Sequence, residues 1–152
     1  MIKVNVKINN KTWNKKIKSP KRYFNQKLKK ISNIINFFKD KNVTFTILLT
    51  NSLNIKKLNK KFRNQNKPTD VLSFPFHSSN NLKIIKQKKL YIGDVAVSYE
   101  IINSRSNKNN FFLEFDKVWI HGLLHLIGYN HVQNKDYFKM QKIEKKIINS
   151  IN

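Results

Sequence analysis

Three of the four histidines in this chain fall within eleven residues, in the segment HGLLHLIGYNH. The apolar residues around the first two predict a helix, and the glycine near its end is a stop signal. Residues four apart share one face of a helix, so the imidazoles of His121 and His125 can reach the same ion. Gly128 has no Cβ and can adopt the left-handed conformation that turns the chain back. The turn would then bring His131 to the same place as a third ligand.

This constellation predicts one bound divalent metal ion, with zinc as the expected metal. The chain has no cysteine, so any ligand must come from histidine, carboxylate or water. Three neutral imidazoles leave a position open for water, which is typical of catalytic zinc, whereas a closed shell of four ligands is typical of a structural site. Such an ion lowers the pKa of its water to about 7 and polarises a phosphoryl or carbonyl oxygen. The sequence therefore predicts hydrolytic chemistry.

The spacing also matches the metalloprotease pattern H-E-x-x-H-x-x-G-x-x-H, with one departure. Gly122 stands where peptide hydrolysis needs a glutamate as its general base. A zinc peptidase is therefore an alternative that the sequence disfavours.

Four segments have the composition of β-strands. Residues 2–8 alternate between apolar and polar side chains, and three short apolar runs follow at 43–49, 71–74 and 90–98. Proline cannot donate to a strand ladder, so Pro75 either ends the third strand or places it at a sheet edge.

The remaining apolar residues recur at helical spacing. A helix is expected to begin at Ser19 and Pro20, and its apolar stripe continues to Phe38. Further helices are expected at 55–62, from about 99, at 111–127 and at 134–150. Residues 77–89 are expected to form an exposed basic loop and residues 103–110 a polar loop. The interleaved elements predict a single α+β domain over residues 1–152. Its small mixed sheet would be packed with about four to five helices, and the metal site would lie at the end of a central helix.

The formal net charge is +23, and residues 1–69 carry 19 of the 31 Lys and Arg residues against one acid. A field of this sign attracts polyanions such as nucleic acids. The excess of lysine over arginine fits solvated surface equally well, so charge alone gives weak support for a nucleic-acid partner. No apolar run is long enough to cross a bilayer, and the N-terminus lacks the apolar stretch of a signal peptide. We therefore expect a cytoplasmic protein without a membrane partner.

Two further blocks accompany the histidine segment in a fixed order. The first, N-x-x-[YF]-R-x-x-x-K-P-T-D-V-L-S-F-P, is matched from Asn59 to Pro75, and the second, G-D-[IV]-x-[IV]-S, is matched from Gly93 to Ser98. With these blocks the sequence resembles the YbeY family of bacterial metal-dependent endoribonucleases.

The resemblance implies a Zn²⁺ ion on His121, His125 and His131, and single-stranded ribosomal RNA as the substrate. It also implies a role in maturation of the 3′ end of the small-subunit RNA and in ribosome quality control, with the small subunit as partner. Arg63 matches the family's arginine that faces the metal, where a guanidinium can clamp a phosphate with two parallel hydrogen bonds. Lys67 is a candidate contact to the RNA backbone. The nucleophile stays open between activated water and the 2′-hydroxyl of the RNA.

One residue departs from the family pattern. Asn130 replaces the aspartate before the last histidine, and an amide cannot supply the negative charge that raises the basicity of a ligand. Asp70 and Asp94 are expected to serve the structure, and His77 is expected to be a loop residue. The alternative function is a non-catalytic, metal-stabilised rRNA-binding factor in ribosome assembly.

Overall fold

Four strands form one mixed sheet in the computed structural model, which describes residues 1–106 and 110–152. The strands are β1 (Ile2–Ile8), β2 (Asn42–Thr50), β3 (Val71–Pro75) and β4 (Lys89–Ser98). Their order is β1-β2-β4-β3; β1, β2 and β4 run parallel, and β3 pairs antiparallel with β4 at one edge. The predicted mixed sheet and the edge position of the strand that ends in Pro75 are confirmed.

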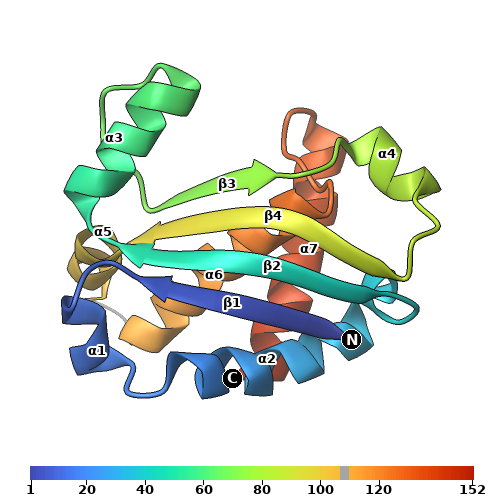
Figure 1. The fold of residues 1–152 in the computed structure, drawn as a ribbon, viewed down its shortest axis with the longest axis horizontal. Coiled ribbons are helices and arrows are strands. Elements are labelled where there is room, and N and C mark those ends of the chain that lie inside the picture. Colours follow the sequence, from blue (N-terminus) through green and yellow to red (C-terminus); the bar gives the residue numbers. More distant parts are fainter. Residues whose placement is uncertain (107–109) are drawn as a thin grey trace.

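Seven α-helices and one 3-10 helix occur among the described residues. They are α1 (Thr12–Lys16), α2 (Pro20–Ile34), η1 (Asn36–Phe38), α3 (Ser52–Arg63), α4 (Ser79–Ile84), α5 (Tyr99–Arg105), α6 (Phe111–Leu126) and α7 (Asn134–Ile151). The helices α2, α6 and α7 cover one face of the sheet, and α3 stands beside β3 and β4 at the other face (Figure 1). None of these helices is long and apolar enough to cross a membrane. The α+β class is confirmed.

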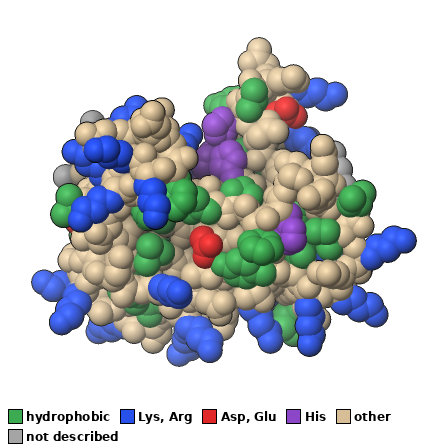
Figure 2. Space-filling model, turned by 45° about the horizontal axis from the view of Figure 1, so that its top comes forward, with side chains coloured by type: hydrophobic (Ala, Val, Ile, Leu, Met, Phe, Trp, Pro, Cys, Tyr) green, Lys and Arg blue, Asp and Glu red, His purple; other side chains and the backbone are tan. Residues whose placement is uncertain are grey.

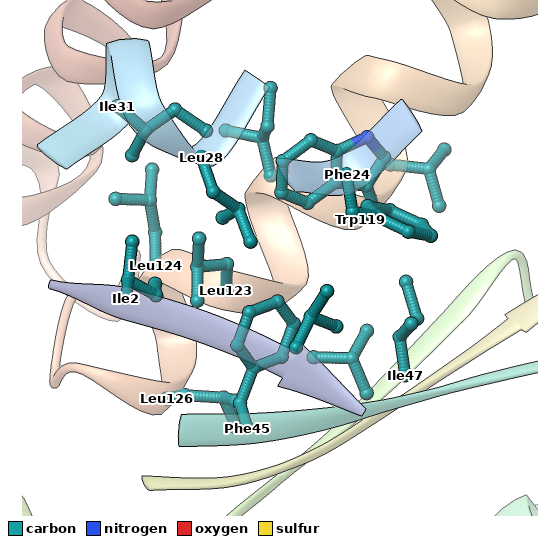
Figure 3. Close-up of a cluster of buried hydrophobic side chains, with 14 of the residues drawn as sticks. Ile2, Phe24, Leu28, Ile31, Phe45, Ile47, Trp119, Leu123, Leu124 and Leu126 are labelled. Carbon is teal, nitrogen blue, oxygen red and sulfur yellow. The ribbon is translucent and has the colours of Figure 1, made fainter. Parts of the chain in front are cut away.

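The main core lies between the sheet and the helices on its covered face. Strands β1 and β2 contribute Ile2, Phe45 and Ile47, and they meet side chains from α2 and α6 (Figure 3). Phe24 and Trp119 pack edge to face at 5.2 Å in this layer. A smaller core, built on Ile55, Leu72 and Ala96, joins α3 to the opposite face of the sheet.

One buried carboxylate ties α2 to α6. Asp116 is fully buried and accepts hydrogen bonds from Tyr23 Oη at 2.7 Å, Lys27 Nζ at 2.6 Å and Trp119 Nε1 at 2.9 Å. The ammonium group of Lys27 compensates its charge, which a buried carboxylate requires. Burial, and then the charge of Asp116, raise the pKa of Tyr23, so this hydroxyl stays protonated as a donor.

The close contact between α6 and the sheet depends on Gly122. A Cβ at this position would lie 2.7 Å from Val95 Cγ1, 3.0 Å from Val71 Cγ2 and 3.1 Å from Ser73 Oγ. Ser73 Oγ donates to the carbonyl of Gly122 at 3.0 Å, so the helix backbone itself contacts β3. The glycine therefore sets how closely the helix approaches β3 and β4.

One predicted helix is shorter than expected, and one predicted loop contains a helix. The helix that starts at Pro20 ends at Ile34, and Phe38 lies in η1, although Ile35 and Phe38 are buried as the apolar stripe required. Residues 77–89 are not only a loop, because α4 lies within them. Ser78 Oγ accepts from the amide of Asn81 and starts this short helix, and Leu82 anchors it in the main core.

The helix count also exceeds the expected four to five. The additional helices are α4 and α1, whose Trp13 is buried and donates from Nε1 to the carbonyl of Thr50 at 2.8 Å. Each of these helices is short and is anchored by a single buried apolar side chain, without a repeated apolar stripe. The predicted loop at 103–110 begins later than expected, after α5 ends at Arg105, and residues 107–109 lie outside the described residues.

The Gly122 contact predicts that Gly122→Ala destabilises the fold. Overpacking costs about 1–3 kcal/mol, and the 2.7 Å contact with the stiff side chain of Val95 places this site in the upper part of that range. The better helix propensity of alanine recovers roughly 1 kcal/mol. We expect the free energy of unfolding in urea to fall by about 1–2 kcal/mol. The exposed Lys57→Ala on α3 should change it by less than about 0.5 kcal/mol. Equal stability of the wild type and Gly122→Ala would contradict the close contact.

Candidate metal centre

The last two turns of α6 present two histidines side by side. His121 Nε2 and His125 Nε2 lie 3.0 Å apart, and the ring centroids are 4.6 Å apart. Both residues are partly buried, so their facing nitrogens are shielded by the fold yet open to solvent. The predicted use of one helix face by this pair is confirmed by the geometry.

The chain leaves α6 through a glycine turn of the Schellman type. Gly128 has a φ of +89°, its amide donates to the carbonyl of His125 at 3.1 Å, and the amide of Tyr129 donates to the carbonyl of Leu124 at 3.1 Å. These two bonds satisfy carbonyls that would otherwise end the helix without partners. The positive φ is strained for any residue with a side chain, so the turn requires glycine here.

The turn returns His131 to the pair on the helix. Its ring centroid lies 5.5 Å from that of His121 and 5.0 Å from that of His125. One ring nitrogen from each of the three histidines lies within 4.8 Å of the other two. The donor set of three imidazoles suits a divalent metal ion.

Hydrogen bonds at the far side of two rings orient them. His125 Nδ1 lies 2.9 Å from the carbonyl of Tyr129, which can only accept, so this nitrogen carries the proton. His121 Nδ1 lies 2.7 Å from Glu144 Oε1 on α7, and the carboxylate accepts in the same way. Each bond leaves the lone pair of Nε2 directed at the shared site, as metal-binding histidines require.

Glu144 was not singled out from the sequence. It occupies the apolar stripe of α7, four residues after the buried Met140 and three before the buried Ile147. An acid in such a stripe needs a partner on the packed side, and that signal was available in the sequence.

Burial, and then the neighbouring His121 ring, lower the pKa of His125 to about 4. The ring is therefore neutral at physiological pH. A neutral imidazole is the form that binds a metal, so little proton competition opposes binding at this position.

The three histidines line a cleft of about 500 Å³. Figure 2 shows histidine side chains in a hollow between two raised parts of the surface. The other walls come from the end of α3, from β3, from the start of α4 and from the glycine turn: Arg63, Thr69, Val71, Leu72, Ser73, Pro75, Ser79, Gly128, Tyr129 and Asn130. Arg63 thus shares one cleft with the histidines, although it lies 58 positions before the first of them in the sequence.

The other candidates from the sequence lie outside this cleft. Lys67 is exposed and does not line it. Asp70 accepts from the amide of Val71 and pairs with Arg105, and Asp94 accepts from Tyr91 Oη at 2.7 Å, so both have structural partners. His77 lies in the turn after β3 and packs against Phe76.

Asn130 lines the cleft but does not orient a histidine ring. Its Oδ1 accepts from the amide of Val132 at 3.4 Å, within the turn that carries His131. The negative charge nearest the rings comes instead from Glu144.

The contact at Gly122 also bears on the peptidase alternative. The side chain of a glutamate here would point into Val95 and Val71 of the sheet rather than toward the three histidines. The zincin base therefore has no place in this fold.

Removing the charge of Glu144 tests the orienting contact. In Glu144→Gln we expect the affinity for Zn²⁺ to fall by about 10- to 100-fold, because an amide supports the His121 ring more weakly. Competition with a chromophoric chelator measures this directly. Asp136→Asn, on the same helix, is the matched control and should bind as the wild type does. Unchanged affinity in Glu144→Gln would rule out the orienting role.

Comparison with known proteins identifies the family to which this chain belongs. The profile of the family described as endoribonuclease YbeY matches residues 7–152. A protein named endoribonuclease YbeY from Pelagibacter ubique is 48% identical over 151 residues, covering 97% of this chain and 94% of that protein. The protein of the same name from Buchnera aphidicola subsp. Acyrthosiphon pisum is 40% identical, covering 95% and 85%.

The fold has a solved counterpart as well. The solution structure of TM1509 from Thermotoga maritima superposes with a TM-score of 0.63 at 26% identity, covering 99% of this chain and 89% of that one. Sequence and structure agree over almost the whole length, and the chain belongs to the endoribonuclease YbeY family.

Proposed function

We propose that this protein is a zinc-dependent endoribonuclease that cleaves single-stranded ribosomal RNA in the cytoplasm. Its role would be maturation of the 3′ end of the small-subunit RNA and quality control of ribosomes, with the small subunit as its partner. The observation that carries the proposal is one cleft lined by three convergent imidazoles and an arginine. Membership of the endoribonuclease YbeY family supports the reaction class.

The ligands for the ion would be His121, His125 and His131. When bound there, zinc supplies a Lewis acid that polarises a phosphoryl oxygen and lowers the pKa of coordinated water. Glu144 and the carbonyl of Tyr129 hold two of the rings with their Nε2 atoms toward the cleft. This preorganisation costs nothing at the moment of reaction, which is the condition for electrostatic catalysis.

Arg63 would bind the scissile phosphate. Its guanidinium is exposed, lines the cleft and can form two parallel N–H···O bonds to a phosphate. Among the described residues that line the cleft there is no carboxylate. The chain's own residues would therefore bind and orient the phosphodiester rather than supply a carboxylate as general base.

Lys67 would bind the RNA backbone outside the cleft. It is exposed after the end of α3 and outside the cleft, where it can meet a neighbouring phosphate of the RNA backbone. The net charge of +23 supports a polyanionic substrate in the same general way.

Loss of one ligand should remove metal and activity together. In His125→Ala we expect zinc content to fall to near zero and cleavage of a single-stranded RNA to fall at least about 100-fold, because two ligands do not hold the ion. Elemental analysis and a gel assay measure the two quantities on one sample. His77→Ala is the matched control, since this histidine lies outside the cluster. A metal-free His125→Ala protein that cleaves normally would disprove the proposal.

Changing the arginine should affect cleavage without affecting the metal. Arg63→Lys keeps the charge but loses the two parallel bonds, so we expect kcat/KM to fall about 10- to 100-fold with zinc content unchanged. Arg22→Lys on α2 is the control.

The alternative function, a non-catalytic assembly factor, predicts a different result. Arg63→Ala would then leave ribosome maturation in cells intact, while charge reversal across the first helices would abolish it.

A further inference from the structure

The edge strand β3 separates two different surfaces. Its residues Val71, Ser73 and Pro75 line the metal cleft on one side. The alternate residues Leu72 and Phe74 pack in the smaller core toward α3, although Leu72 also lines the cleft. Because β3 is an edge strand, a flexible chain that crosses it would meet both surfaces.

Four aromatic rings occupy the outer side of this strand, and we call them the aromatic row: Phe62, Phe74, Phe76 and Tyr91. Phe62 packs edge to face on Phe74 at 5.1 Å, and Phe76 packs edge to face on Tyr91 at 5.7 Å. Phe62 is 58% exposed and Phe76 is 67% exposed. Edge-to-face pairs leave ring faces open, so these rings can stack on other flat groups.

A bulge in β4 contributes to this surface. Between Tyr91 and Asp94 the strand has one residue more than β2 has opposite it, and Gly93 adopts a φ of +131° there. A Cβ on Gly93 would lie 2.2 Å from the carbonyl oxygen of Phe74. The bulge places Tyr91 and Asp94 on the same side, where the hydroxyl donates to the carboxylate. The tyrosine ring is thereby held beside Phe76.

The electrostatic surroundings favour an anionic occupant. Lys61 Nζ lies 5.3 Å over the ring of Phe62. Lys7 lines an apolar groove of about 440 Å³ together with Phe62 and Phe74. Asp94 is the acid of the groove, and its carboxylate already accepts from Tyr91. Figure 2 shows hydrophobic side chains near the histidines on one face, with lysines and arginines around them.

The chain also connects the two surfaces at α3. Phe62 belongs to the aromatic row, and the next residue, Arg63, lines the metal cleft. A ligand that lies on both surfaces must carry flat apolar faces beside negative charge. Single-stranded RNA has this alternation in every nucleotide.

We propose that the aromatic row is a base-stacking platform that holds the nucleotides flanking the scissile phosphate of a single-stranded RNA. The inference rests on the proposed endoribonuclease function, and it assigns part of the substrate to a surface outside the metal cleft. Bases of any sequence have a stacking face, so the platform gives affinity for single strands without sequence preference. A duplex, whose bases are already stacked, gains nothing from it.

The test compares RNA binding by the full-length wild type and Phe62→Ala/Phe76→Ala. Both rings are largely exposed, so the double variant should fold as the wild type does, and the urea midpoint checks this. The probe is a fluorescein-labelled 12-nucleotide RNA of mixed sequence with cleavage-resistant linkages, titrated in an anisotropy assay. We expect the Kd to rise at least about tenfold, because each lost ring removes one stacked base. The salt dependence should stay the same, since no phosphate contact is removed.

Two matched controls sharpen the result. Phe138→Ala removes a similarly exposed ring that lines neither the cleft nor the groove, and its Kd should stay within twofold of the wild type. An abasic 12-mer should bind the wild type and the double variant equally. Equal Kd values on the base-bearing RNA would overturn the platform and leave a protein partner as the occupant of the groove.

Cleavage of the unmodified oligonucleotide by the wild type separates the two proposals. If the wild type cleaves RNA but the double variant binds it normally, the platform alone fails. If the wild type neither binds nor cleaves RNA, the proposed function fails, and the platform fails with it.

Discussion

At Gly122 the backbone of α6 itself contacts the sheet. Because no side chain separates α6 from Val71, Ser73 and Val95, the helix lies directly on β3 and β4. That approach places the end of the helix, and therefore His121 and His125, beside the edge strand. The cleft exists because one wall is the end of this helix and the other includes the strand that the helix touches.

Two segments outside α6 orient the imidazoles on it, and a third holds the helix itself. The glycine turn gives a carbonyl to His125, and α7 gives a carboxylate to His121. The buried pair of Asp116 and Lys27 ties α6 to α2 further up the same helix. His121 and His125 therefore lie on a helix held by the sheet, α2 and α7, whereas His131 and Arg63 are exposed. Such a division suits a site that must be rigid at the ion and accessible to a polymer.

Much of this could be predicted because it depends on neighbours in the chain. The pairing of His121 with His125 follows from helical spacing, and the return of His131 follows from a glycine three residues before it. The strands and most helices follow from periodicity in the same way. The errors arose where one buried residue decides the matter: Trp13 fixes α1 and Leu82 fixes α4, and a single apolar residue leaves no period to detect.

Spacing between nearby residues was enough to predict the three candidate histidines, the order of the four strands and of five helices, and the α+β class. The packing of distant elements was needed to show that Glu144 contacts His121 and that Arg63 lines the same cleft as the three histidines. These contacts join residues tens of positions apart, so they depend on how the helices and the edge strand pack. The physical reason is that periodicity records which side of an element is apolar but not which element lies against it.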